Sequence, residues 1–134
     1  MRALRYLFFK RSFVLVRRAL SDADEAVRAA AVNAIYGLHF PHAFNPLARL
    51  CREHTEVQIV RAALESIGKI GSIEAADFLV GMMRQAQGPI REAALAALRA
   101  IDNPDAVPIL RQHAEIEADA ELREALTALV RKFG

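Results

Sequence analysis

A chain of 134 residues, 54% of them hydrophobic and 25% charged, is long enough to bury a core as one domain or as one continuous array of repeats. A single cysteine, Cys51, excludes an internal disulfide and fits a reducing compartment, so we expect a cytoplasmic protein. No unbroken apolar run reaches the roughly 18 residues of a membrane span, and Lys10 and Arg11 interrupt the apolar start too early for a secretory signal.

The formal net charge of +2 is unevenly distributed along the chain. Residues 1–20 contain six of the 18 basic side chains and none of the 16 acidic ones. The rest of the chain therefore carries twelve basic against sixteen acidic side chains, a net charge of −4. A basic arm of this kind is often an anion-binding arm, whereas the acidic remainder disfavours a nucleic-acid backbone as the partner.

The beginning of the chain predicts a helix over 2–20, or two helices with a break near residues 10–12. Its large apolar residues form two stripes on nearly opposite sides. One stripe contains Tyr6, Phe9, Phe13, Val16 and Leu20, and the other contains Leu4, Phe8 and Leu15. We expect the first stripe to pack on the following helix. The second stripe, together with Arg11, is the predicted docking surface for a neighbouring chain or a second copy.

Ala-rich phrases then recur at intervals of 31 or 32 residues. Ala and Leu are strong helix formers, and apolar residues at steps of three and four lie on one face of a helix. The predicted inward sets are Val27, Ala30, Ala31, Ala34, Ile35 and Leu38; Ile59, Ala62, Ala63, Ser66, Ile67 and Ile70; Ile90, Ala93, Ala94, Ala97, Leu98 and Ile101; and Leu122, Ala125, Leu126, Leu129, Val130 and Phe133. A period of this length is typical of a stacked array of helical repeats.

Two pairs of residues have the spacing of a capping box, in which a side chain before the helix and one in its first turn satisfy free backbone N–H groups. Asp22 pairs in this way with Glu25 before the first Ala-rich helix. Thr55 pairs with Gln58 before the second, which we expect to end at Gly71.

The intervening segments predict the remaining helices. Asn45 and Pro46 open a helix with Leu47, Leu50 and Cys51 inward; Ser72 caps a helix with Ala76, Leu79, Val80 and Met83 inward; and Asn103 to Asp105 open a helix through Val107, Ile109 and Leu110. An acidic connection over 115–119 leads to a last helix over 120–133. The prediction is an all-α protein, an α-solenoid of four antiparallel helical hairpins over about 1–38, 43–70, 73–101 and 104–133.

Three of the Ala-rich phrases resemble the second helix of a HEAT repeat, in the short variety first noticed in phycobilisome lyases. They are Val27–Arg28 with Ala30–Ala31 and Ala34–Ile35; Ile90–Arg91 with Ala93–Ala94 and Ala97–Leu98; and Val60–Arg61 with Ala62–Ala63 and Ile67–Gly71. The resemblance implies a stacked helical fold, but that family includes scaffolds, adaptors, lyase subunits and a few enzymes. Such repeats usually form an Asp–Arg ladder between neighbours. Arg61 lies one place later than Arg28 or Arg91, which leaves its part in that ladder open.

No grouping of residues predicts an active site, so we expect no enzyme activity, no cofactor and no metal. His39 and His42 have a spacing that can chelate a metal on a helix, but Phe40 and Pro41 place the pair in a turn. Cys51 lies on the apolar side of its helix, which favours a small buried hydrophobic residue over a nucleophile.

In a HEAT-like stack the Ala-rich helices line the concave side, and their outward residues form the candidate partner-binding groove. It contains Asn33, Tyr36, Arg61, Glu65, Lys69, Glu92 and Arg99, followed in the last repeat by Arg123, Glu124 and Arg131. This mixture of charges fits a polar protein surface better than a nucleic-acid backbone. Arg28 and Arg91 lie on the same helices, and we expect them to bond within the stack instead. Their expected acceptors are Asp24 and Asp119.

The leading hypothesis is therefore a non-enzymatic protein-interaction or scaffold module with an unidentified protein partner. Two alternatives remain open. A subunit of a bilin lyase or phycobilisome-processing factor, which the repeat variety resembles, would retain a tetrapyrrole. A nucleic-acid binder, similar to the alkylpurine DNA glycosylases built on HEAT-like repeats, would bind in a strongly salt-dependent way.

Overall fold

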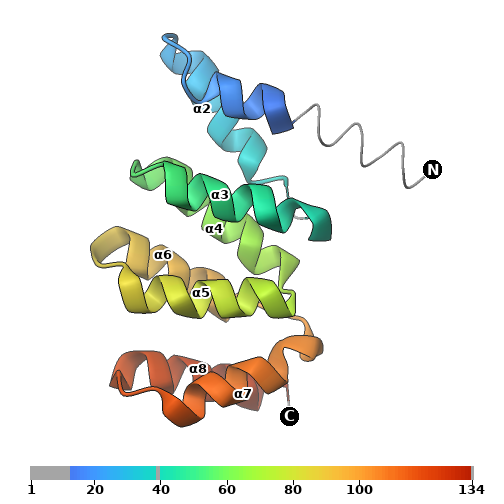
Figure 1. The fold of residues 1–134 in the computed structure, drawn as a ribbon, viewed down its shortest axis with the longest axis vertical. Helices are drawn as coiled ribbons and strands as arrows, with labels where there is room; N and C mark the ends of the chain where they lie inside the picture. The colour runs from blue at the N-terminus through green and yellow to red at the C-terminus, as the bar shows by residue number, and fades with distance from the viewer. Residues whose placement is uncertain (1–12, 39, 134) are drawn as a thin grey trace, which may run out of the picture.

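The computed structural model describes residues 13–38 and 40–133, and the described part is a stack of helices along one long axis (Figure 1). It contains eight α-helical segments and no strand. The segments are 13–19, α2 (Glu25–Ile35), α3 (Phe44–Glu53), α4 (Val57–Ile70), α5 (Ile73–Gln85), α6 (Gly88–Arg99), α7 (Val107–Ile116) and α8 (Ala120–Lys132). Short 3-10 turns at Pro41–Ala43 and Pro104–Ala106 lead into α3 and α7. This architecture confirms the predicted all-α solenoid.

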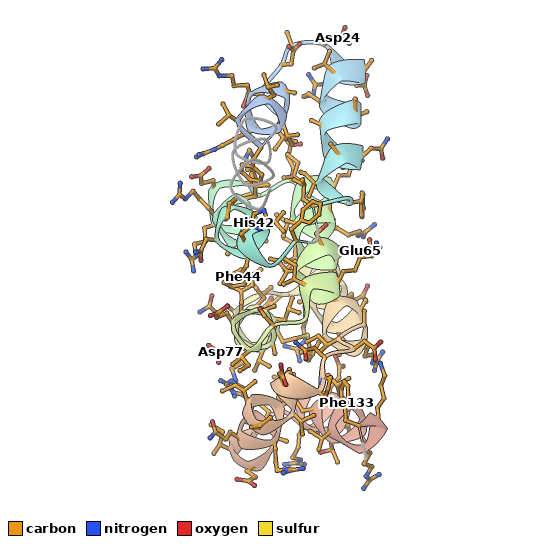
Figure 2. The ribbon with its side chains drawn as sticks, turned by 90° about the vertical axis from the view of Figure 1, so that its right-hand side faces the viewer. Asp24, His42, Phe44, Glu65, Asp77 and Phe133 are labelled. Carbon is orange, nitrogen blue, oxygen red and sulfur yellow. The ribbon has the colours of Figure 1, made fainter. Side chains whose placement is uncertain are left out.

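The helices form two layers, which Figure 2 shows edge on. The first layer contains helix 13–19, α3, α5 and α7, and the second contains α2, α4, α6 and α8. Across the layers α3 packs against α4, α5 against α6 and α7 against α8, and α4 also contacts α5. Within the layers α3, α5 and α7 follow one another, as do α2, α4, α6 and α8. Phe44 and Asp77 thus lie on the first layer and Glu65 on the second. We call the second layer the even-helix layer.

Several predicted helix boundaries are confirmed. Ser72 caps α5, because its hydroxyl oxygen accepts from the backbone N–H of Ala75 at 3.1 Å. Asn103 caps the turn before α7 by accepting from the backbone N–H of Asp105. Gly71 ends α4 in the left-handed conformation, with φ at 60°, which a residue without Cβ adopts at no cost.

Both predicted capping boxes are wrong. Asp24, not Asp22, caps α2 and accepts from the backbone N–H of Ala26, while the Asp22 carboxylate accepts from the Asp24 N–H and shapes the preceding turn. Before α4 the cap position belongs to Glu56, one residue after Thr55, and it forms no side-chain cap bond.

Two further boundaries differ from the expectation. Asn45 lies inside α3 rather than at its cap, because the preceding 3-10 turn runs directly into the helix and Ala43 becomes the cap residue. The acidic connection is shorter than expected, since α7 continues through Glu115 to Ile116.

The predicted inward residues of the two central repeats form the core. In α4 the residues Ile59, Ala62, Ala63, Ser66 and Ile67 are buried, and Ile70 is half-buried. In α5 the inward set Ala76, Leu79, Val80 and Met83 is fully buried. In α6 the buried residues are Ala94, Ala97 and Leu98, followed by Ile101, while Ile90 and Ala93 are half-buried. The three- and four-residue periodicity therefore identifies the core face correctly where a repeat has neighbours on both sides.

The first Ala-rich helix departs from this pattern. Ala31 and Ile35 of α2 are buried, but Val27, Ala30 and Ala34 are exposed. These three lie on the side that would meet a preceding repeat, and the described part of the chain has none there. The sequence pattern identifies the inward positions of a repeat, but it does not show whether a neighbouring repeat covers them.

Two contacts hold the even-helix layer together at its centre. A Cβ added to Gly68 of α4 would lie 2.6 Å from the backbone oxygen of Ala97 in α6, so only glycine permits this helix separation. The buried Ser66 hydroxyl donates to the carbonyl oxygen of Ile35 at the end of α2, at 2.5 Å. Small side chains thus set the spacing from α2 to α6.

Candidate interaction surface

The outward side of α2, α4, α6 and α8, here called the even-helix face, holds the residues predicted for partner binding. Of these, Asn33, Arg61, Glu65, Lys69, Glu92 and Arg99 are exposed, and Tyr36 is half-buried. Their helices lie side by side in one layer, so the structure places the predicted residues on one continuous side of the stack (Figures 1 and 2).

A hollow of about 440 Å³ lies on this face between α4 and α6. It brings together the predicted residues Arg61, Glu65 and Glu92. The other lining residues are Pro89, Ala93, Ala96, Ala97 and Ala100 of α6 and its C-terminal end. Because those side chains are small, the charged groups stand around an apolar floor.

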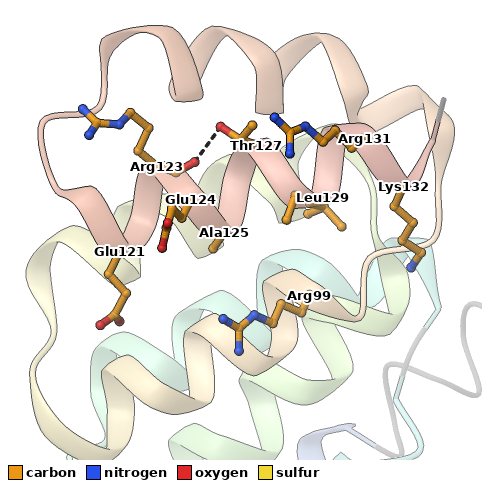
Figure 3. A pocket seen from close by; sticks show the side chains of 10 residues that line it. Arg99, Glu121, Arg123, Glu124, Ala125, Thr127, Leu129, Arg131 and Lys132 are labelled. Atoms are coloured by element: carbon orange, nitrogen blue, oxygen red, sulfur yellow. Dashed lines mark hydrogen bonds between the residues drawn. The ribbon is translucent and has the colours of Figure 1, made fainter.

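A second hollow, of about 680 Å³, lies between α6 and α8. Figure 3 shows Arg99 on α6, with Glu121 and Glu124 extending from α8 into the space between the two helices. Ala125 and Leu129 of α8 also line this hollow. The charged groups thus surround a partly apolar recess, as in the first hollow.

The first hollow lies beside a close helix contact. Gly68 of α4 allows this contact with α6, whereas the place one repeat later holds the exposed Arg99 and the place two repeats later holds Arg131. Arg99, which the sequence places in the groove, lines the second hollow.

Several charged residues of the even-helix face lack a partner within the chain. Within residues 13–38 and 40–133, no hydrogen bond or ion pair is formed by the side chains of Arg61, Glu92, Arg99, Glu124 and Arg131. Lys69 and Glu65 form an exposed pair at 3.9 Å, which contributes little to stability. These charged groups are therefore available to an external partner.

A repeated arginine contact explains why Arg61 is available. Arg28, Arg91 and Arg123 are each the fourth residue of their helix, and each donates back to a main-chain carbonyl before that helix. The fourth residue of α4 is the buried Val60, and Arg61 follows it at an exposed position. The one-residue displacement in the sequence thus removes Arg61 from the internal contact.

The expected Asp–Arg ladder is present at one junction. Arg91 Nη2 lies 2.9 Å from Oδ2 of Asp119, the cap residue of α8. The backbone N–H of Leu122, with Arg91 beside it, holds the pKa of the Asp119 carboxyl below its usual value. Arg28, by contrast, bonds the carbonyl oxygens of Asp22 and Ala23 rather than Asp24, which corrects the expectation for that residue.

Charged contacts in the other layer join successive repeats. Arg17 lies 2.6 Å from Glu53, and His113 of α7 lies 2.7 Å from Asp77 of α5. Arg84 Nε donates to Glu117 at 2.7 Å, and its guanidinium also approaches Nδ1 of His113. Although burial alone raises the pKa of Glu117, hydrogen bonds from Arg84 and a backbone N–H outweigh it and lower the pKa. These ion pairs and hydrogen bonds join neighbouring repeats of the stack.

The remaining candidate chemical groups are the two histidines and the cysteine that the sequence singled out. Among the described residues, no group of three or more His, Cys, Asp or Glu side chains could hold a metal ion. His42 is exposed, and His39 lies outside the described residues. Burial raises the pKa of the Cys51 thiol to about 12, which fits the expectation of an unreactive, largely buried side chain.

The predicted N-terminal docking helix falls mostly outside the described residues, which exclude Leu4, Phe8 and Arg11. Of that set, Leu15 is described and is 65% exposed. The docking function of this segment stays a prediction. Among the described residues, none of the helices could span a membrane.

Comparison with known proteins agrees with the stacked helical hairpins. The family described as HEAT repeats matches residues 14–99. The family described as PBS lyase HEAT-like repeat matches residues 90–115, which cover most of α6 and most of α7. No curated protein matches the chain.

Proposed function

Because the chain belongs to the HEAT repeat family, we propose that it is a protein-interaction module that binds its partner along the even-helix face and catalyses no reaction. The observation that carries this proposal is the unpaired charge around the two hollows. Arg61 and Glu92 border the first, and Arg99 and Glu124 border the second. Each is exposed and unpaired within the described residues.

The geometry supports recognition of a protein rather than a small ligand. Both hollows are open, and they lie next to each other along the stack, so a partner that follows the face contacts both. Arginine is enriched among the residues that dominate binding energy at protein interfaces. An alanine floor leaves room for partner side chains, while alternating charges select the register in which the partner lies.

Charge reversal tests the proposal. The variant Arg61→Glu with Arg99→Glu changes one arginine at each hollow, and we expect it to weaken partner capture at least tenfold. Arg49→Glu with Arg111→Glu is the matched control, because those arginines are exposed and unpaired on α3 and α7 of the other layer.

The assay is affinity capture from the source cells with the intact chain, the even-helix variant and the control. Proteins retained by the intact chain and the control but lost from the even-helix variant support the proposal. Equal retention by all three proteins, or no protein retained specifically by the intact chain, contradicts it. Thermal unfolding should be nearly the same for the three, because none of the four arginines forms a hydrogen bond or ion pair with another described residue.

A second candidate rests on the match of residues 90–115 to the PBS lyase HEAT-like repeat. On this hypothesis the chain is a subunit of a bilin lyase or a phycobilisome-processing factor. Protein purified from its source would then retain a tetrapyrrole with visible absorbance. Colourless protein that also takes up no added bilin would rule this candidate out.

A further inference from the structure

The two hollows of the even-helix face differ in their balance of charge. The hollow between α4 and α6 is lined by one basic side chain, that of Arg61, and by two acidic ones, those of Glu65 and Glu92. The hollow between α6 and α8 is lined by four basic and two acidic side chains, which belong to Arg99, Arg123, Arg131, Lys132, Glu121 and Glu124. Of the two hollows, the second therefore carries the excess of positive charge.

This excess remains when the pairs within the chain are taken into account. Glu121 lies 3.8 Å from Arg91, and Lys132 lies 4.0 Å from Asp102, so each of these two lining groups has an opposite charge nearby. The other charged lining groups are three arginines and a single glutamate, Glu124. The positive charge of the second hollow is thus not balanced by acidic groups of the described residues.

Arg99 and Arg131 are the arginines of this hollow that have no internal acceptor. They occupy equivalent places in successive repeats, at the C-terminal ends of α6 and α8, and both are exposed (Figure 3). A basic side chain at a helix end can serve main-chain carbonyl groups, and Lys132 does so by donating to the carbonyl oxygen of Ile101 at 3.2 Å. Within the described residues, Arg99 and Arg131 bond neither a carbonyl nor a carboxylate. An anion from outside the chain would stabilise two like charges placed in this way.

The positions of the acidic groups favour a peptide carboxylate over a nucleic-acid phosphate. Glu124 precedes Arg131 by about two turns of α8, or about 10 Å along its axis, so acidic groups lie beside the arginines rather than among them. Glu65 and Glu92 continue the acidic groups along the first hollow. A nucleic acid carries a charge on every phosphate and would bring some of these charges close to the glutamates. A single carboxylate between neutral residues avoids that repulsion, and arginine binds carboxylates through two parallel N–H donors.

We propose that the second hollow binds a segment of a partner polypeptide that places an Asp or Glu side chain between Arg99 and Arg131. Apolar atoms of the same segment would contact Ala125, Ala128 and Leu129, which line the same hollow. This inference rests on the proposed function of the even-helix face, because it names the chemistry of the partner that binds there.

The test uses peptides selected from a random-sequence display library on the intact chain, with the tightest binder measured by fluorescence anisotropy. We expect the selected sequences to be enriched in Asp and Glu. Arg99→Gln with Arg131→Gln should weaken binding about tenfold, whereas Glu124→Gln should strengthen it by removing the neighbouring negative charge. Arg49→Gln with Arg111→Gln, on α3 and α7 of the other layer, is the matched control and should leave the affinity unchanged.

A second probe is the same peptide with its acidic side chains changed to the corresponding amides. It should bind the intact chain about ten times more weakly than the parent peptide, yet bind the Arg99→Gln with Arg131→Gln variant as well as the parent does. Equal weakening on both proteins, weaker binding to Glu124→Gln, or selected sequences without acidic enrichment would overturn the inference. It would also be overturned by a single-stranded oligonucleotide that binds more tightly than the peptide and is lost from the same double variant.

Failure of this inference can be distinguished from failure of the proposed function. A selected peptide that is weakened by Arg61→Gln but not by the double substitution of Arg99 and Arg131 overturns the inference and leaves the even-helix face as the binding surface. A peptide that responds to substitution of Arg49 and Arg111 alone contradicts both.

Discussion

Replacing Gly68 by alanine tests the close packing of α4 on α6. The added Cβ would lie 2.6 Å from the carbonyl oxygen of Ala97 and 3.0 Å from its Cα and Cβ. These atoms belong to a helix backbone and the start of its side chain, so they cannot rotate away. Overpacking of this kind costs about 1–3 kcal/mol.

Helix propensity acts in the opposite direction, because alanine in a helix interior is favoured over glycine by about 0.5–1 kcal/mol. The net expectation for Gly68→Ala is a loss of up to about 2.5 kcal/mol, because the clash with backbone atoms outweighs the gain in helix propensity. Gly81 in α5 provides the matched control, since a Cβ there would meet no atom within 4 Å. In Gly81→Ala only helix propensity changes, so we expect its free energy of unfolding to rise by about 0.5–1 kcal/mol.

Urea denaturation followed by circular dichroism measures both variants, with the midpoint reporting the free energy of unfolding when the slope is unchanged. The midpoint should fall for Gly68→Ala and rise for Gly81→Ala. If both variants were stabilised to the same extent, the close approach of α4 and α6 would be refuted.

Three further predictions follow from the core and its caps. Ala94→Phe should lower the free energy of unfolding by about 1–3 kcal/mol through overpacking, because Ala94 is fully buried; an unchanged denaturation midpoint would contradict close helix packing there. Ser66→Ala removes the hydrogen bond to Ile35 and should cost about 0.5–1.5 kcal/mol, whereas a change near zero would show that the bond contributes nothing. The folded-state pKa of Asp119 lies below the ordinary aspartate value of 3.8, so its stabilising contribution is present above that pH and is lost as the pH falls through the folded-state pKa. The melting temperature of Asp119→Asn should accordingly fall less than that of the intact chain between pH 5 and pH 2.5, and equal decreases would contradict the cap and the Arg91 contact.

Periodicity predicted the fold well where local sequence and neighbouring repeats act together. The inward residues of α4 and α5 follow from steps of three and four because both helices have partners on either side. Ser72 was predictable as a helix start because its own side chain caps the helix. Gly71 was predictable as a helix end because a residue without Cβ adopts the left-handed conformation easily.

The wrong predictions concern residues whose burial or capping role depends on a neighbouring segment of the chain. Ala30 carries the same pattern as Ala62, yet it is exposed because its repeat has no described predecessor. Asp24 and Asp22 are both good cap residues, and the choice between them depends on how the preceding turn enters the helix.

The candidate surface was predictable as a set of outward positions but not as a shape. Arg61 and Arg99 follow from helical spacing, which places them outside the core. The two hollows depend on the distances between α4, α6 and α8, and Gly68 permits the close approach of α4 and α6. Pro89 and Ala96 enter the lining through that spacing, and no motif in the sequence marks them.

Site-specific photo-cross-linking tests the proposed partner surface most directly. A photoreactive side chain at Ala96, an exposed residue of the hollow between α4 and α6, reports what lies on the even-helix face in the source cells. The same group at Arg111, exposed on α7, reports the other layer. We predict a discrete protein adduct from position 96 that is absent from position 111. An adduct from position 111 with none from position 96 would contradict binding at the even-helix face.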